Sequence, residues 1–287
     1  MTVLEAIQKS ADFLAKKGVE SPRLQTELLL AHLLNLPRMS LYLNFERALK
    51  PAETDALREF VKRRGRREPL QHLVGSTSFC GLEMAVDRRV LVPRPETEIL
   101  AELGWQFLNQ LSTLNPQPST VLDFGTGSGC LAIALAVKCP AAQVWASDVS
   151  PEALDLAKQN AARHNVADRI RFLQGDGFSA LSEKMQFDLV ISNPPYIPTI
   201  EIESLQPEVR DFDPRRALDG GPDGLDFFRR LAAEAGGFLK PGGRIMLEFG
   251  DGQVDAIRKL FDAQKWIVEA VKEDYSQRAR ILIAKPN

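Results

Sequence analysis

The chain has 287 residues and a mass of 31.9 kDa, enough for one large domain or two unequal ones. Hydrophobic residues make up 44% of it and charged residues 26%, which excludes a disordered chain and, with ordinary Gly and Pro usage, a collagen or a coiled coil. The net charge of −2 argues against a protein that coats nucleic acid, because such proteins are usually basic.

The cysteines and the hydropathy of the chain indicate in which cell compartment the protein is expected. Cys80, Cys130 and Cys139 form neither a CxxC pair nor an even set, so no disulfide framework, zinc ribbon or other metal site is expected. Charged residues near the N-terminus argue against a signal peptide. The longest apolar run, Cys130–Val137, is far shorter than the ~18 residues of a membrane span. We therefore expect a cytoplasmic protein without a membrane partner.

The N-terminal region is predicted to be helical. Apolar residues recur at helical spacing over residues 1–72, which predicts a small all-α bundle. Its last helix ends in a basic cluster, Lys62–Arg67, which is either a solvated helix terminus whose cations suit the helix dipole or a docking site for an acidic or nucleic-acid partner. Short alternating runs over residues 73–92 then predict a β-hairpin linker. The prolines expected at helix starts are Pro22, Pro37 and Pro51.

A second domain is expected over residues 93–287. From Thr120 onward strands and helices alternate, which predicts an open α/β sheet, mostly parallel, with helices on both faces. The two closing strands are joined by a short polar segment, so they are expected to pair antiparallel. The expected strands are 120–124, 143–148, 170–174, 187–192, 244–249 and, near the end, 267–271 and 280–284. The expected helices are 130–138, 151–165, 224–239 and 253–264, with a turn at 240–243.

A glycine-rich turn is the first motif that carries chemistry. The strand ending in Asp123-Phe124 runs into Gly125-Thr126-Gly127-Ser128-Gly129 and then into a helix. Glycines let a ligand approach the backbone, and amides at a helix N-terminus can receive a polar or anionic group. The GxGxG spacing differs from the GxGxxG of dinucleotide-binding folds. A tight strand-to-helix turn without a ligand would also use glycines, and that interpretation stays open.

A second acidic residue, Asp148, closes the next expected strand, 25 residues after Asp123. A carboxylate at this place can accept two hydrogen bonds from a ribose diol, as an acidic residue does about 20 residues beyond a Rossmann glycine loop. Alternatively, Asp148 caps the next helix, because Ser150-Pro151 follow it. The position of Asp148 relative to the glycine turn favours ribose binding.

The most specific motif is Asn193-Pro194-Pro195-Tyr196, where the expected strand 187–192 ends. Ligand sites in open parallel sheets gather at the carboxyl ends of the strands. The two prolines have a fixed φ and no N–H, so the segment presents carbonyl oxygens in a stiff arrangement, to which Asn193 adds a side-chain oxygen. These acceptors can hold both hydrogens of a planar –NH₂ group, beside which Tyr196 offers a flat wall. A rigid proline turn without chemistry is the alternative.

These motifs resemble those of class I S-adenosylmethionine-dependent methyltransferases, and the tetrapeptide resembles that of enzymes that methylate exocyclic –NH₂ groups. Over essentially the whole chain, the sequence is similar to the protein-(glutamine-N5) methyltransferases of the PrmC (HemK) family. The matching segments, besides the N-terminal bundle, are Phe79-x-Gly81-Leu82, Val92–Glu98, Pro207–Val209, Pro214, Ala217-Leu218, Gly220-Gly221 and Glu248–Gly250 with Gln253.

The resemblance implies a Rossmann-like class I methyltransferase sheet with S-adenosylmethionine as cofactor. It implies an enzyme that methylates the side-chain amide of the glutamine in the Gly-Gly-Gln motif of peptide chain release factors, with the bundle recognising this protein substrate. The cofactor-binding residues it implies are Asp123, Gly125, Thr126, Gly127, Ser128, Gly129, Asp148, Asp176, Gly177 and Asn193. The catalytic and substrate-binding residues it implies are Asn193, Pro194, Pro195 and Tyr196, with Arg94 as a further substrate contact.

Two other functions fit parts of the sequence. Methylation of adenine or cytosine in nucleic acid fits the tetrapeptide and the basic cluster Lys62–Arg67. The net charge and the family-like N-terminal region favour the release factor instead, so nucleic acid is not expected to be required. A cofactor-binding module without catalysis is the third possibility, and the intact Asn193 argues against it. Gly177 also departs from the family pattern, because a bulkier residue often stands there.

Overall fold

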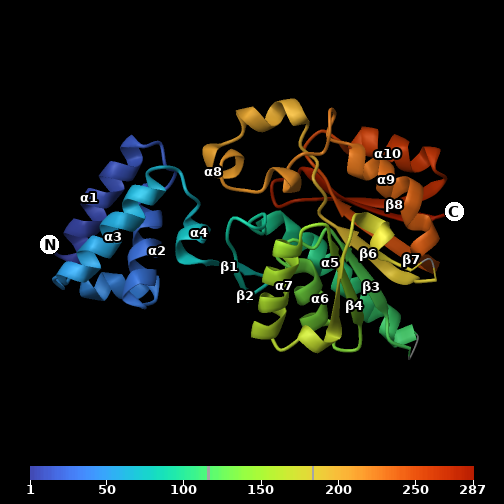
Figure 1. Ribbon diagram of the computed structural model, residues 1–287, viewed down its shortest axis with the longest axis horizontal. Helices are drawn as coiled ribbons and strands as arrows, with labels where there is room; N and C mark the ends of the chain where they lie inside the picture. The colour runs from blue at the N-terminus through green and yellow to red at the C-terminus, as the bar shows by residue number, and fades with distance from the viewer. Residues whose placement is uncertain (115–116, 183) are drawn as a thin grey trace. The chain divides into compact units, whose positions relative to one another are not determined.

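The computed structural model describes residues 1–114, 117–182 and 184–287. It forms two compact units, each with its own hydrophobic core. The first, called here the N-terminal unit, consists of Met1–Ser76 and Leu205–Phe212. The second, the sheet unit, consists of Thr77–Ser204 and Asp213–Asn287. Figure 1 gives the element labels.

The N-terminal unit contains the helical bundle that the sequence predicts over residues 1–72, together with residues 73–76 and the segment 205–212, which the sequence prediction placed in the linker and in the second domain. Helix α1 begins with a capping box, in which the Thr2 hydroxyl accepts from the Glu5 N–H and the Glu5 carboxylate accepts from the Thr2 N–H. Pro22 and Pro51 open helices, whereas Pro37 precedes a 3₁₀ segment, Arg38–Asn44. The helices are α1 (Val3–Lys16), α2 (Pro22–Leu34), α3 (Pro51–Arg64), α4 (Leu70–Val74) and α8 (Pro207–Arg210).

The basic cluster Lys62–Arg67 is largely used inside the N-terminal unit. Arg64, only 3% exposed, donates to Glu208 Oε1 at 2.7 Å, and Arg67 donates to the same oxygen at 2.6 Å. Burial raises the pKa of Glu208, but the hydrogen bonds from Arg67 and Arg64 outweigh it and hold this pKa below its ordinary value. Arg64 and Arg67 thus fasten the segment 205–212 to the bundle, a role that neither sequence interpretation included.

The sheet unit contains a seven-stranded sheet in the order β5-β4-β3-β6-β7-β9-β8. The strands from β5 to β7 run parallel, and β9 runs antiparallel to both β7 and β8, which confirms the predicted fold class. The chain winds outward from β3 to β5 and then returns to β6, so β3 and β6 form a topological switch point, where ligands bind in such sheets. The strands are β3 (Thr120–Phe124), β4 (Gln143–Asp148), β5 (Ile170–Gln174), β6 (Phe187–Ser192), β7 (Leu239–Glu248), β8 (Trp266–Glu273) and β9 (Ala279–Pro286), preceded by the hairpin β1 (Ser76–Phe79) and β2 (Leu82–Ala85).

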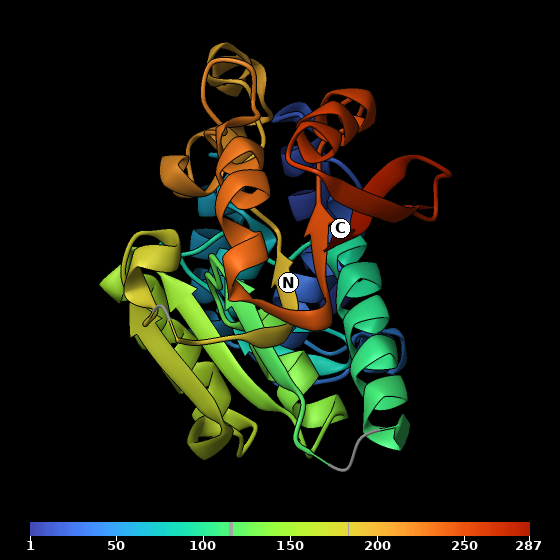
Figure 2. The ribbon, with the colours of Figure 1, turned by 90° about the vertical axis from the view of Figure 1, so that its right-hand side faces the viewer.

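Helices cover both faces of this sheet (Figures 1 and 2). Alternate residues of β3 belong to different cores, Val121 to one face and Leu122 to the other. None of the helices in the described residues is long and apolar enough to cross a membrane. The helices on one face are α5 (Pro95–Leu114), α6 (Cys130–Lys138) and α7 (Pro151–Arg163), and those on the other are α9 (Asp226–Glu234) and α10 (Val254–Ala263).

The boundaries that differ most from the sequence prediction lie at the end of α9 and the start of β7. The helix expected over 224–239 is α9 followed by a 3₁₀ turn, Ala235–Phe238. Strand β7 begins at Leu239 rather than after a turn at 240–243. Its pairing with β6 jumps from Phe187 opposite Leu239 to Leu189 opposite Arg244, so the Gly-Pro-rich residues form a bulge within the strand.

Candidate active site

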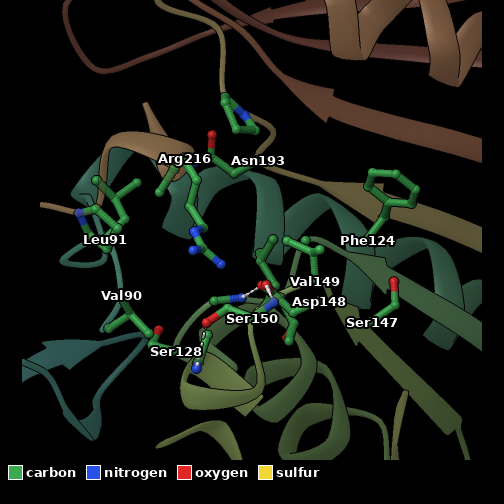
Figure 3. Close-up of a pocket in the computed structure, with 18 of the residues that line it drawn as sticks. Val90, Leu91, Phe124, Ser128, Ser147, Asp148, Val149, Ser150, Asn193 and Arg216 are labelled. Atoms are coloured by element: carbon green, nitrogen blue, oxygen red, sulfur yellow. Dashed lines mark hydrogen bonds between the residues drawn. The ribbon is translucent and has the colours of Figure 1, made fainter. Parts of the chain in front are cut away.

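A cavity lies at the switch point of the sheet, within the sheet unit. It encloses about 1010 Å³ of atom-free space, part of it open to solvent. Figure 3 shows Asp148 and Asn193, from two different strand ends, facing this space. The predicted site residues in its wall are Arg94, Gly125, Thr126, Gly127, Ser128, Asp148, Asp176, Gly177, Asn193 and Pro195. The predicted residues outside the wall are Asp123, Gly129, Pro194 and Tyr196.

The glycine turn presents bare backbone to the cavity. Gly125 and Gly127 have φ values of +73° and +54°, which L side chains rarely adopt, and a Cβ at either would meet no atom within 4 Å. They therefore face open space. Gly129 differs, because its Cβ would lie 3.0 Å from the Cβ of Ala157 in α7. The first two glycines leave room for a ligand, and the third allows two helices to pack.

Asp123 lies under this turn and is fully buried. Its Oδ2 accepts from the Thr126 hydroxyl at 2.6 Å and from the Ala132 N–H at 3.1 Å. Its Oδ1 has no hydrogen-bond partner among the described residues. Burial raises the pKa of Asp123 to about 7, against the effect of these two hydrogen bonds. Asp123 thus acts on the cavity by fixing the turn to the start of α6.

Asp148 is held in place by backbone amides at the end of β4. Its Oδ2 accepts from the Gly127 N–H and its Oδ1 from the Ser150 N–H, both at 2.9 Å. The cap of α7 is Ser150, whose hydroxyl accepts from the Ala153 N–H. A carboxylate offers about four acceptor positions, so Asp148 keeps two for a diol in the cavity.

Asp176 and Gly177 follow β5, beside Arg230 of α9. The Asp176 carboxylate pairs with the Arg230 guanidinium at 2.5 Å. Gly177 has a φ of +63°, and a Cβ there would lie 2.6 Å from Arg230 Cζ. The guanidinium occupies the space of a side chain at position 177, which gives a physical reason for glycine here.

The tetrapeptide begins beside the glycine turn. The Ser192 hydroxyl donates to the Phe124 carbonyl at 2.6 Å and ties the end of β6 to the end of β3. Asn193 and Pro195 lie in the cavity wall. Pro194, between them in the sequence, is buried and is not one of the wall residues. Two neighbouring strand ends thus deliver the two motifs to one space.

Tyr196 supports the tetrapeptide from behind. Its ring packs against the core that α9 and α10 cover, where burial raises its pKa to about 12. Its carbonyl oxygen accepts from Gln253 Nε2 at 2.9 Å, and a Cβ at Gly224 would lie 2.3 Å from the same oxygen. The close approach of this loop and the Gln253 hydrogen bond fix the backbone after Pro195.

Two residues that the motifs did not single out hold Asn193: Thr97, which itself lies in the cavity wall, and Glu248, which lies behind it. Asn193 Nδ2 donates to Thr97 Oγ1 of α5 at 3.0 Å, and this hydroxyl donates to Glu248 Oε2 at the end of β7 at 2.7 Å. Thr97 and Glu248 are each only 2% exposed. Burial raises the pKa of Glu248 to about 7, the Thr97 hydrogen bond opposes this, and the charge of Glu96 adds to it. In the sequence, Thr97 and Glu248 were marked only by their place in two segments that resemble the family, Val92–Glu98 and Glu248–Gly250.

Arg94 links the cavity wall to Asp213, the first residue of the sheet unit after the segment 205–212. Its guanidinium donates to Asp213 Oδ2 at 2.7 Å, where the chain re-enters the sheet unit. Burial raises the pKa of Asp213 to about 6, against the charge of Arg94. Arg216, also not predicted, reaches over the cavity toward Ser150 (Figure 3).

The sheet, its switch point and the two motifs at one cavity define a class I methyltransferase. Residues 5–75 match the family model of the PrmC N-terminal domain, and residues 103–204 match that of the methyltransferase small domain. The chain belongs to the family of release factor glutamine methyltransferases. It is 45% identical to the Geobacter sulfurreducens member over 91% of this chain and 88% of that protein. It is 41% identical to the Moorella thermoacetica member over 99% and 98% of the two.

A solved structure supports the fold. The methyltransferase from Pyrococcus furiosus superimposes with a TM-score of 0.53 and 22% identity, covering 78% of this chain and 97% of that one. S-adenosylmethionine is the cofactor of this class, and the cavity fits it. Gly125 and Gly127 leave an open backbone surface, and Asp148 retains two acceptor positions beside it. In the described parts of the chain, no group of three His, Cys, Asp or Glu side chains could hold a metal ion.

Proposed function

We propose that this protein transfers a methyl group from S-adenosylmethionine to the side-chain amide nitrogen of the glutamine in the Gly-Gly-Gln motif of a peptide chain release factor. The observation that carries this is the position of Asn193, which faces the same cavity as the glycine turn and Asp148. An –NH₂ group held at Asn193 therefore meets a cofactor bound along the turn. Relatives named for this reaction match nearly the whole chain.

The chain's task in this reaction is alignment and charge stabilisation. Bound S-adenosylmethionine supplies a methyl group on a sulfonium and leaves as the neutral thioether. The acceptor nitrogen is a poor nucleophile, because amide resonance delocalises its lone pair. Asn193 Oδ1 accepts one of its hydrogens, and the backbone carbonyl of Pro194, at the link between the two wall residues Asn193 and Pro195, accepts the other. This aims the nitrogen at the methyl carbon and stabilises the positive charge that develops as the N–C bond forms. The nitrogen then loses one proton to water.

The residues proposed to contact the cofactor lie in the cavity wall. Asp148 would accept from the ribose hydroxyls of S-adenosylmethionine, Asp176 would accept from its adenine amino group, and the turn from Gly125 to Ser128 would hold its methionine part. Arg94 contacts the entering substrate loop. Asp123 and Tyr196 support these groups from behind.

Methylation of a nucleic-acid base is not favoured. Two arginines of the basic cluster, Arg64 and Arg67, are committed to Glu208, and the net charge is −2. A duplex base must also be flipped out at a cost of a few kcal/mol, whereas a glutamine on a loop enters directly. Nucleic acid is therefore not required, and since release factors work on ribosomes, we place the enzyme in the cytoplasm.

The bundle of residues 1–72 is proposed to recognise the body of the protein substrate, with 73–92 as linker and 93–287 as the catalytic domain. The described residues that line the cavity all follow residue 88, so the bundle has no part in its wall. A whole release factor should therefore be methylated with a much higher kcat/KM than a short peptide that carries Gly-Gly-Gln. Equal values for the two substrates would contradict this role.

The acceptor is tested with labelled S-adenosylmethionine. The enzyme is incubated separately with a release factor, its Gln→Ala loop variant, DNA and ribosomal RNA. Label on the wild-type factor alone is expected. Label on a nucleic acid, or undiminished label on the loop variant, would overturn the proposed function.

A further inference from the structure

The orientation of the Asn193 side chain decides what it can bind. The oxygen and the –NH₂ of an amide have nearly the same size, so the shape of a site does not select between them. An –NH₂ acceptor needs an oxygen opposite it. If Nδ2 faced the cavity, donor would meet donor. Hydrogen-bond partners behind Asn193 must therefore set its direction.

Thr97 is the partner that contacts Asn193. A hydroxyl has one proton to donate and lone pairs with which to accept. Thr97 Oγ1 lies 2.7 Å from Glu248 Oε2 and 3.0 Å from Asn193 Nδ2. If its proton goes to Glu248, only lone pairs remain for Asn193, and Nδ2 has to face Thr97.

Glu248 determines where that proton goes. An ionised carboxylate has no proton and can only accept, which forces Thr97 to donate to it. A protonated carboxyl group can donate to Thr97 instead, whose own proton is then free for Asn193 Oδ1, and the amide turns over. The charged and titratable groups around Glu248 come from each element packed against it: Glu96 of α5, Arg94 before that helix, Tyr196 after β6 and Arg280 of β9.

We propose that Thr97 and Glu248 are positioning residues that fix the direction of the Asn193 amide and so turn its oxygen toward the methyl acceptor. This rests on the proposed function, since only an acceptor with N–H groups needs an oxygen there. Both residues act through Asn193 and transfer no proton to or from the substrate. They extend the acceptor site to α5 and β7.

The hydroxyl is tested with Thr97→Val, which keeps the shape and removes the proton and lone pairs. Leaving Nδ2 unpaired should lower the single-turnover rate at saturating substrates roughly 10- to 100-fold, with little change in the KM for the release factor. Thr97→Ser should restore most of the lost rate. Thr113→Val is the matched control, because its hydroxyl lies on the exposed end of the same helix and donates to the Gln110 carbonyl.

The carboxylate is tested with Glu248→Gln. A glutamine can accept from Thr97 or donate to it, so the chain of hydrogen bonds loses its direction, and the rate at pH 8 should fall about tenfold. In the wild type, the rate should decline below pH 7 as Glu248 takes up a proton, and this decline should be absent from the variant. Glu102→Gln, at an exposed position of α5, should behave as the wild type.

A measurement on the free enzyme separates this inference from the proposed function. With asparagine labelled in the side-chain amide, the NMR signal of Asn193 is identified by its loss in Asn193→Ala. It should shift in Thr97→Val but not in Thr113→Val, and its titration near pH 7 should vanish in Glu248→Gln. An unshifted signal in Thr97→Val, or wild-type rates in both Thr97→Val and Glu248→Gln, would overturn the inference even if the wild type methylates a release factor. If it methylates none, the proposed function fails and the NMR result alone decides the inference.

Discussion

Replacing Asp123 with asparagine should stabilise the sheet unit at alkaline pH relative to the wild type. Asp123 is fully buried, one of its oxygens has no partner among the described residues, and burial raises its pKa to about 7. Asparagine has the same shape, and its oxygen can still accept from Thr126 and Ala132. It therefore resembles the protonated aspartic acid and lacks only the charge.

The sign and size of the effect follow from proton binding. The pKa of Asp123 in the folded protein, about 7, lies above the ordinary value of 3.8, so folding favours the protonated form. The stabilisation that comes from this preference is fully present below pH 3.8. As the pH rises from 3.8 to 7, the free energy of unfolding falls by about 1.4 kcal/mol per pH unit. The variant should equal the wild type near pH 4 and exceed it by about 4 kcal/mol at pH 8. Glu248 and Asp213 also have raised pKa values, so they lower the stability with rising pH in the same way. Both residues are present in the wild type and in the variant, so their effects cancel in the difference.

Urea titrations between pH 5 and pH 8, followed by tryptophan fluorescence, measure this difference. The chain's three tryptophans, Trp105, Trp145 and Trp266, all lie in the sheet unit, so the signal reports on that unit. The stability gap should widen by about 3 kcal/mol over this range. The control Asp262→Asn, at an exposed position of α10, should show no widening. A gap for Asp123→Asn that stays constant with pH would refute the reasoning.

Three further variants test other parts of the molecule. Asp148→Ala should weaken S-adenosylmethionine binding by about 1.5–3 kcal/mol in calorimetry, because it removes charge-assisted hydrogen bonds, and an unchanged affinity would remove Asp148 from the site. Asn193→Ala should lower the single-turnover rate about 10²-fold, since an acceptor for the reacting amide is lost, while the cofactor affinity is largely kept; a wild-type rate would contradict the mechanism. Glu208→Gln should destabilise the N-terminal unit by about 1–3 kcal/mol, because the buried Arg64 loses its charged partner. Trypsin should then cleave faster at Arg210. An unchanged melting temperature and cleavage rate would show that this ion pair does not stabilise the segment 205–212.

Local patterns were sufficient for much of the sheet. The bounds of β3, β4, β5 and β6 are those that the sequence predicts, because each strand is a short, largely apolar run that ends at or directly before a polar residue or a glycine. The site position follows from the same information, since the glycine turn and Asn193 each come directly after a strand. Adjacent strand ends then bring them to one cavity. Family membership, confirmed by the relatives, rests on these same segments.

Side-chain pairs that are distant in sequence could not be predicted in this way. Arg64 and Glu208 are 144 positions apart, and Thr97 and Glu248 are 151 apart. Such pairs leave no periodicity and no local composition signal. For this reason the sequence prediction placed the cluster Lys62–Arg67 in solvent or against a partner. It did not identify Thr97 and Glu248, which hold Asn193.

The motifs also mix two kinds of residue that sequence alone does not separate. Gly127 faces the cavity, whereas a Cβ at Gly129 would meet Ala157 of the next helix. In the tetrapeptide, Asn193 lies in the cavity wall, whereas Tyr196 packs into the core behind it. Loss of activity after substitution of a motif residue therefore does not by itself place that residue at the cofactor or the substrate. Stability has to be measured beside cofactor affinity and single-turnover rate, because the loss of a residue that packs behind the wall lowers stability as well.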